Sequence, residues 1–197
     1  MRRRLHVPEL GGARAAILHR PHATVEALGR QLSAIGLTWE AHWPDLPPVA
    51  LAADYAFFDV DRGFDAQFPW EPGQAPMPTV ALIGSEAPGR IEWALAMGAD
   101  APMLKPIGGS GAYAALLLAR AAFEHRRALL AEAEALRARL SERQTVVRAV
   151  LILAAGGLGE EAAYAELRRR AQAHRVTIEE AAARIAAQGS SGGRAQR

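Results

Sequence analysis

The sequence predicts a doubly wound α/β domain with five parallel strands, followed by one long helix and a small helical unit. Short apolar runs alternate with helical patterns through residues 13–104, which is typical of a parallel sheet covered by helices on both faces. Residues 112–155 contain neither proline nor glycine, so they can form a single long helix. Two shorter helical patterns follow the glycine-rich break at residues 156–159.

Five short segments are predicted to be strands because they are apolar or alternate between apolar and polar residues. Residues 13–18 and 54–61 have the composition of buried strands, and the second of these ends in acids. Residues 37–43 alternate, whereas residues 79–84 and 101–104 are short apolar runs.

Helices and loops are expected between and around these strands. Residues 21–36 carry apolar side chains at helical spacing and end at a glycine, and residues 86–98 form a second helix that also ends at a glycine. Residues 62–78 are rich in proline and glycine and are expected to form a loop. The two ends of the chain, residues 1–12 and 189–197, are expected to be loose tails.

The only lysine of the chain follows the last predicted strand. Parallel strands place their carboxyl ends at one edge of the sheet, where functional crevices form. Lys105 should therefore lie at the same edge as Asp59, near the end of the third predicted strand. His19, Arg20 and Gly84 follow or end two further strands and belong to the same edge.

Composition excludes several kinds of protein. The chain has 197 residues and no cysteine, so it has no disulfide, thiolate metal site or cysteine nucleophile. Neither a signal peptide nor a membrane span is expected, which favours a cytoplasmic protein. The histidines show no metal-binding spacing, and Asp59 and Asp61 are not accompanied by a further catalytic group. We therefore expect no metal, no cofactor and no enzymatic activity.

The two halves of the chain differ in charge. Residues 13–112 carry 6 basic and 11 acidic side chains, whereas residues 113–197 carry 14 arginines and 9 glutamates. Such asymmetry indicates two parts with different partners, a polyanion being the partner of the second. The alternative is that the arginines only solvate helix faces.

A heptad pattern runs along the predicted long helix. Residues recur there at alternating spacings of four and three, which indicates a coiled-coil seam that pairs two copies of the chain. The apolar seam residues are Leu129, Ala133, Leu136, Leu140, Val147 and Val150. Arg143 also falls on the seam but is charged. The alternative is an amphipathic helix packed on its own domain.

Residues 160–174 and 178–188 are predicted to be two further helices, the second with a capping box formed by Thr177 and Glu180. A phosphate-contacting face for a polyanion would draw on the arginines of these helices. If the polyanion is a nucleic acid, unpaired bases can also stack on guanidinium planes and on the single aromatic residue after Phe123. The candidates are Arg148, Tyr164, Arg168, Arg169 and Arg175. The arginines could equally be solvated, and the tyrosine could belong to the core.

Residues 13–122 resemble the receiver domain of two-component response regulators. The run DYAFFDV occupies the place of the strand that ends in the phospho-accepting aspartate, here Asp59, and GADAPMLKP matches the family's last strand. The resemblance implies a flavodoxin-like fold in which Lys105 contacts the phosphoryl group. It also implies a cis peptide bond before Pro106.

The chain departs from the receiver pattern at the residues that bind Mg²⁺. The family's two adjacent acids are replaced by His19 and Arg20, and its hydroxyl-bearing residue falls on Gly84. Phosphoryl transfer depends on the metal, and Mg²⁺ takes oxygen ligands, so we expect that Asp59 is not efficiently phosphorylated. Arg20, Lys105 or both would instead neutralise Asp59 and hold the site in one state.

Residues 143–188 resemble the ANTAR domain, a three-helix RNA-binding module of transcription antiterminators. The run VRAVLILAAGGLGEEAAYAELRRRAQ supplies the apolar core helix, the central glycine and the acidic helix start of that family. It departs where the usual Ala-Lys pair reads Arg148-Ala149 and where a common arginine reads Ala155. Residues 123–142 are the expected coiled-coil linker.

The order of receiver-like domain, long helix and ANTAR domain is similar to that of the AmiR family of antiterminators, and LSAIGLTWEAHWPD at residues 32–45 carries part of the likeness. The resemblance implies a homodimer that binds a leader RNA with paired hairpin loops. It also implies restraint by a ligand-sensing partner with a periplasmic-binding-protein fold. Two alternatives stay open: a phosphorylation-dependent response regulator that uses Asp59, and a protein-interaction scaffold without RNA binding.

Overall fold

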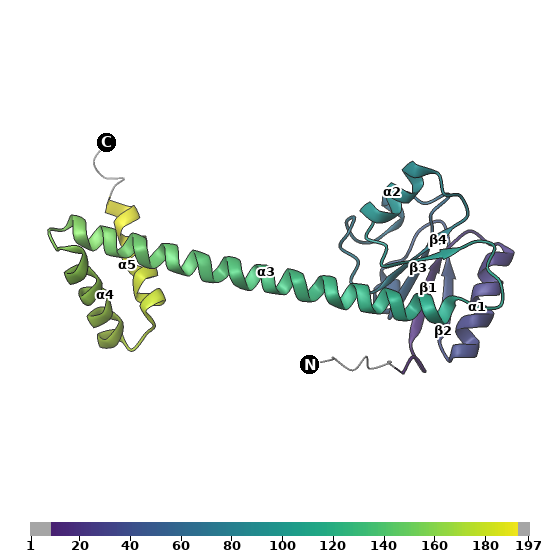
Figure 1. Ribbon diagram of the computed structural model, residues 1–197, viewed down its shortest axis with the longest axis horizontal. Helices are drawn as coiled ribbons and strands as arrows, with labels where there is room; N and C mark the ends of the chain where they lie inside the picture. Colours follow the sequence, from purple (N-terminus) through teal and green to yellow (C-terminus); the bar gives the residue numbers. More distant parts are fainter. Residues whose placement is uncertain (1–8, 193–197) are drawn as a thin grey trace. The chain divides into compact units, whose positions relative to one another are not determined.

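The computed structural model describes residues 9–192, so most of the two predicted tails, residues 1–8 and 193–197, lies outside the described part. The chain forms two compact units, which divide between Ala128 and Leu129 (Figure 1). The division falls within the expected linker, residues 123–142. One helix, α3 (Ala112–Ala155), is continuous through it and contributes residues to both units.

The first unit is built on a five-stranded parallel sheet, as the sequence predicts. Its strand order is β2-β1-β3-β4-β5, so β3 lies at the centre. The strands are β1 (Arg14–Leu18), β2 (Thr38–His42), β3 (Tyr55–Asp59), β4 (Thr79–Ile83) and β5 (Ala101–Leu104). The three inner strands are almost wholly buried, whereas β2 is an edge strand and largely exposed. This difference explains why β2 alternates in polarity and the inner strands do not.

Helices cover both faces of the sheet, which makes the first unit doubly wound. α1 (Ala23–Ile35) and the first turns of α3 pack on one face. α2 (Pro88–Ala96) and a short 3-10 helix, η1 (Pro48–Ala52), pack on the other. The predicted loop 62–78 contains one further 3-10 turn, η2 (Asp65–Gln67).

Both ends of α1 have an identifiable cap. The His22 ring precedes the helix, and its Nδ1 accepts a hydrogen bond from the Thr24 backbone N–H at 3.2 Å. Gly36 ends the helix with a φ of 96°, a left-handed conformation that glycine adopts without a steric penalty. The glycine stop expected from the sequence therefore has a backbone reason.

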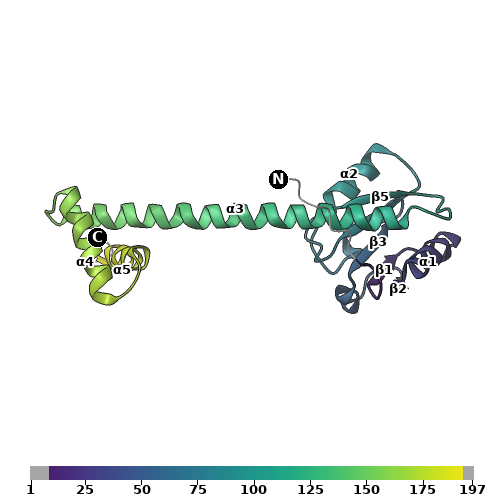
Figure 2. The same cartoon turned by 60° about the horizontal axis from the view of Figure 1, so that its bottom comes forward.

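The second unit is a three-helix cluster in which α4 (Glu160–His174) and α5 (Ile178–Gly192) pack with the last turns of α3 (Figure 2). Its core consists mainly of alanine with a few larger side chains: Ala149, Leu167, Ala171, Ala181, Ala182 and Ile185. Small core side chains let helices approach one another closely. Gly157, with a φ of 96°, allows the chain to turn between α3 and α4.

α5 ends later than the sequence predicts. The expected helix stopped at Gln188, before a run of glycine and serine, but the observed helix continues to Gly192. Extending an existing helix needs no new nucleus, and each glycine lowers helix stability by only about 1 kcal/mol relative to alanine. A flexible tail beginning at Gly189 was therefore wrong for its first four residues.

α3 is the longest element, with 44 residues, and most of it is exposed after Phe123. Charged residues are spread along this exposed part. Accordingly, no helix within residues 9–192 is long and apolar enough to cross a membrane.

Candidate functional site

The carboxyl edge of the sheet brings one lysine against two carboxylates. Lys105, directly after β5, places its Nζ 2.6 Å from Asp59 Oδ1 and 2.6 Å from Asp61 Oδ2. Asp59 is the last residue of β3, and its side chain is only 3% exposed, so its charge needs a partner. Lys105 supplies that partner from the far side of β4. The peptide bond between Lys105 and Pro106 is cis.

Asp61 is held by several donors. Its Oδ1 accepts hydrogen bonds from the backbone N–H groups of Gly84, at 3.2 Å, and Ser85, at 2.8 Å, while its Oδ2 faces Lys105. Partial burial raises the pKa of Asp61, but Lys105 and the two N–H groups outweigh this effect and bring the pKa below its usual value. Asp61 is therefore ionised at neutral pH.

His19 and Arg20, directly after β1, differ in their relation to Asp59. His19 is buried, and its Nε2 lies 3.8 Å from Asp59 Oδ2. Its Nδ1 lies 2.7 Å from the Arg20 carbonyl oxygen, which can only accept, so Nδ1 carries a proton. The Arg20 side chain is exposed and makes no ion pair with Asp59 in the described part of the chain. Of the two cations expected to neutralise Asp59, Lys105 is the one in contact.

The residues at this edge do not suit the Mg²⁺ that receiver domains hold. A hard cation needs several free oxygen ligands, but Asp59 and Asp61 both face Lys105. The positions of the family's two acids hold a histidine and an arginine. No group of three or more potential metal ligands occurs within residues 9–192. The site is built around an internal lysine.

The predicted seam residues lie along the part of α3 that belongs to the second unit. Leu129, Leu136, Leu140 and Val147 are between 52% and 59% exposed, and Ala133 is half-buried. Large apolar side chains left in water at heptad spacing favour burial against another helix. The described part of this chain does not cover the four exposed residues. The last predicted seam residue, Val150, is instead partly buried against the core of the second unit.

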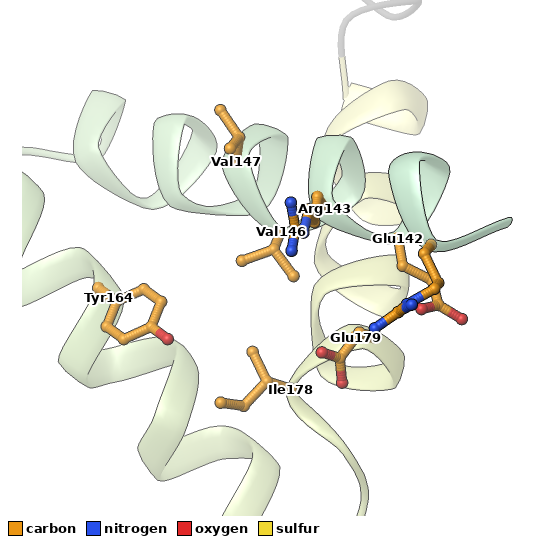
Figure 3. A pocket seen from close by; sticks show the side chains of 8 residues that line it. Glu142, Arg143, Val146, Val147, Tyr164, Ile178 and Glu179 are labelled. Carbon is orange, nitrogen blue, oxygen red and sulfur yellow. The ribbon is translucent and has the colours of Figure 1, made fainter. Parts of the chain in front are cut away.

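A cavity of about 490 Å³ opens between the three helices of the second unit (Figure 3). Figure 3 shows Tyr164 on α4, Val146 on α3 and Ile178 at the start of α5 pointing toward one another across it. The Tyr164 side chain is 43% exposed, and Arg139 and Arg143 line the same cavity from α3. An accessible ring beside guanidinium groups offers surfaces on which an unpaired base can stack.

The cavity is not itself a cationic patch. Glu142 and Glu179 also line it, so they balance the charges of Arg139 and Arg143. Contacts to phosphate groups would therefore have to come from arginines outside the cavity.

Two of the candidate arginines lie on α4 near Tyr164 but differ in their contacts. Arg168 follows Tyr164 by four residues and so lies on the same side of the helix. Arg169 pairs with Glu166 at 2.5 Å, and Arg170 contacts the same carboxylate at 2.8 Å. Arg170 and Arg169 together hold the pKa of Glu166 below its usual value. Arg168 is thus the better placed of the two to act with Tyr164.

The remaining candidates lie away from the cavity lining. Arg148 is exposed on α3 beside the fully buried Ala149. Arg175 occupies the turn after α4 with a φ of 53°, a left-handed conformation in which glycine is usual. The described structure therefore does not gather all five predicted RNA contacts at one place.

Two parts of these sites escaped the sequence analysis. The role of Asp61 depends on N–H groups of Gly84 and Ser85, which the sheet brings near from another strand. The only sign of this contact in the sequence is Gly84, which stands where receiver domains have a hydroxyl-bearing residue. Arg143 was assigned to the seam and Arg139 was not singled out, because only the packing of α3 against α4 and α5 places them at the Tyr164 cavity.

Two family models match the chain. The model described as AmiR, N-terminal, matches residues 13–120, which is more than half of the chain. The model described as ANTAR domain matches residues 134–185. No curated protein matches the chain.

Several solved structures are similar to the chain at low identity. ShkA Rec1, crystallised in complex with c-di-GMP, is 24% identical over 56% of this chain and 94% of its own, with a TM-score of 0.44. A response regulator receiver protein from Burkholderia phymatum is 18% identical over 49% of this chain and 86% of its own, with a TM-score of 0.38. Full-length FixJ from B. japonicum is 16% identical over 91% of this chain and 98% of its own, with a TM-score of 0.46.

The two matched models correspond to the two ends of the chain. The first covers the doubly wound sheet with Asp59 and Lys105 at its carboxyl edge, and the second covers the three-helix cluster that holds Tyr164. The chain therefore belongs to the AmiR family and is an AmiR-like antiterminator with a receiver-like N-terminal domain and a C-terminal ANTAR domain.

Proposed function

We propose that this chain is a homodimeric RNA-binding regulator of transcription antitermination, controlled by a protein partner rather than by phosphoryl transfer. The observation that carries the proposal is the ANTAR match over residues 134–185, because this segment holds the exposed Tyr164 and its neighbouring arginines. By binding a leader transcript, the protein would favour an RNA structure that lets transcription continue.

The RNA contact is proposed to centre on Tyr164. Sequence-specific proteins usually read RNA through unpaired loop bases, and stacking on an aromatic side chain contributes about 1–3 kcal/mol per base. Tyr164 is 43% exposed and lines an open cavity, so one loop base can reach its ring. Arg168, one turn further along α4, is suited to contact a phosphate group of the same loop. Arg148, Arg169 and Arg175 would add further charge.

Dimerisation is proposed to occur along the exposed seam of α3. Burying a fully exposed leucine side chain contributes about 1.5–3 kcal/mol, and Leu129, Leu136 and Leu140 on the seam each have more than half of that surface to bury. A dimer presents two ANTAR units, which fits a target with two hairpin loops. The second loop then binds at a high effective concentration.

Control is proposed to reach the first unit through a protein partner. Asp59 is buried and paired with Lys105, and a histidine and an arginine stand where receiver domains have two metal-binding acids, which supports control without phosphoryl transfer. A ligand-sensing protein with a periplasmic-binding-protein fold would restrain the dimer in the cytoplasm and release it when its own ligand changes.

The test is a titration of the full chain with RNA pools in which one or two hairpins carry randomised loops. We expect selection of specific loops from the two-hairpin pool, tighter binding to two hairpins than to one, and affinity that falls with salt. Arg148→Ala should weaken binding, whereas Arg30→Ala, an exposed arginine of α1, is the matched control. Failure of the two-hairpin pool to yield any binding loop would contradict the proposal and favour a protein-interaction scaffold.

A further inference from the structure

Exposed apolar side chains on α3 recur every eleven residues. In the part of α3 that belongs to the second unit, they form what we call the eleven-residue row: Leu129, Leu136, Leu140, Val147 and Leu151. Leu129, Leu140 and Leu151 are eleven residues apart, and the same number separates Leu136 from Val147. All five side chains are between 52% and 63% exposed. Leu118, also exposed, precedes Leu129 by eleven residues and follows the same spacing in the sequence.

The row and the predicted heptad seam differ after Leu140. The heptad pattern passes through Arg143 and Val150. Arg143 is charged and lines the cavity of the second unit, and Val150 is partly buried against the core of that unit. Leu151, one residue further along, is exposed. The row, rather than the heptad pattern, therefore follows the apolar surface that the described part of the chain leaves uncovered.

The row lies on a different side of α3 from the residues that pack within the second unit. Val146 and Ala149 belong to the core that α3 forms with α4 and α5. Figure 3 shows Val146 pointing toward Tyr164, whereas Val147, a member of the row, points away from it. A second protein helix can therefore contact the row without displacing α4 or α5.

The regular spacing identifies the kind of partner that the row fits. Eleven residues complete three turns at about 3.67 residues per turn, so two helices with this repeat stay in contact when they run side by side with a right-handed supercoil. A globular partner would not require a constant spacing along a helix. The described helix that carries the matching repeat is α3 itself, so the partner is α3 of a second copy of the chain.

Gln144 indicates the direction in which the two helices run. Each repeat has one further inward position, four residues after a leucine of the row, and Ala133 and Gln144 occupy it. In a parallel pair Gln144 faces its own copy, and the two amide groups can donate to and accept from each other. In an antiparallel pair centred on Leu140, Gln144 would face Leu136, and its amide would be buried without a partner.

We propose that two copies of the chain pair in parallel through the eleven-residue row, with a right-handed supercoil in place of the left-handed one of a heptad coiled coil. The inference rests on the proposed homodimer, to which it adds the geometry and a further contact residue, Leu151. Leu151 is two residues from Ala149, which is fully buried in the core of the second unit. The dimer contact therefore holds the two ANTAR units at a fixed spacing from each other.

The experiment uses single cysteines in the full chain, which has none of its own. Leu140→Cys lies at the contact in both patterns and should form a disulfide between two copies under mild oxidation. Leu151→Cys should cross-link at a similar rate, whereas Arg143→Cys, which belongs only to the heptad pattern, should cross-link much more slowly. Leu130→Cys, exposed on the same helix but outside both patterns, is the matched control and should not cross-link. Because all four residues are exposed, the substitutions should leave the helical circular dichroism signal unchanged.

Two results would overturn the inference and leave the proposed homodimer in place. Rapid cross-linking of Arg143→Cys together with slow cross-linking of Leu151→Cys would show that the copies pair through the heptad pattern. Equal rates for all four variants, Leu130→Cys included, would show that no defined row of residues makes the contact. Absence of cross-linking in Leu140→Cys has a different meaning, because it would overturn the pairing along α3 itself.

Discussion

At the scale of single residues, one lysine compensates two carboxylates. The side chains of Lys105 and Asp59 are 14% and 3% exposed, so their ion pair is screened little by water. Removing one member of such a pair leaves an uncompensated buried charge, which costs more than the pair itself contributes. Lys105 is therefore expected to stabilise the first unit.

Lys105→Met should lower the free energy of unfolding of the first unit by about 3–5 kcal/mol, because Asp59 then loses its buried partner. Urea denaturation followed by tryptophan fluorescence measures this unit, since all 4 tryptophans precede residue 94. Adding Asp59→Asn to Lys105→Met should restore much of the loss. A loss no larger than that of an ordinary surface substitution would show that the pair is not structural.

The pH dependence of stability should report the Asp61 ion pair. The pKa of Asp61 lies below its ordinary value of 3.8 in the folded chain, so its contribution is fully present above that value and is lost as the pH falls through the lower folded pKa. Asp59, His19 and Lys105 face the same site and are present in both proteins under comparison.

We therefore expect the stability difference between the wild type and Asp61→Asn to be largest near neutral pH and to shrink below about pH 4. Urea midpoints measured across this range test it. A difference that stays constant into acid would mean that the Asp61 charge contributes nothing.

RNA binding should depend on the aromatic ring of Tyr164. Tyr164→Ala should weaken binding to a selected two-hairpin RNA by about 1–3 kcal/mol per stacked base, whereas Tyr164→Phe, which keeps the ring, should bind nearly as well as the wild type. Filter binding at one fixed salt concentration measures both. Equal weakening by the two substitutions would show that the hydroxyl group, and not stacking, makes the contact.

Part of this arrangement of side chains at the sheet edge could be predicted from the sequence. Lys105 and Asp59 could be placed together because parallel strands end at one edge of the sheet. The Asp61 contact could not, because it depends on backbone N–H groups whose positions no residue type reveals. Arg20 stood next to His19 in the sequence, but its side chain is exposed.

At the scale of elements, apolar pattern and glycine position carried most of the prediction. The five strands and the long α3 appear where short apolar runs and an unbroken helical segment predict them. The patterns fail at ends that local sequence does not control. α5 continues through glycine and serine to Gly192, and Arg175 takes a left-handed turn without glycine.

The proposed dimer contact along the seam of α3 can be tested directly. Leu136→Glu and Leu140→Glu should dissociate the proposed dimer, because each places a charge where an apolar side chain would be buried. Leu130→Glu is the matched control, since Leu130 is equally exposed on the same helix but lies off the seam. Light scattering gives the mass of each variant. A wild-type chain that stays monomeric, or a seam variant that stays dimeric, would contradict the assignment.

At the scale of the whole molecule, the two units differ in charge and in the family that each matches. The acidic half carries the receiver-like unit, in which Lys105 pairs with Asp59 and Asp61. The arginine-rich half carries the ANTAR unit. We therefore propose that the receiver-like unit receives the signal from a protein partner and that the ANTAR unit binds the RNA. No part of this signal passes through a phosphoryl group on Asp59.

The affinity of the full chain for a selected two-hairpin RNA, measured with and without prior incubation with acetyl phosphate and Mg²⁺, tests this account most directly. We predict specific binding in both cases, with the same dissociation constant. A dissociation constant that changes after the incubation would contradict the account. Absence of specific binding in both cases would contradict its RNA-binding half.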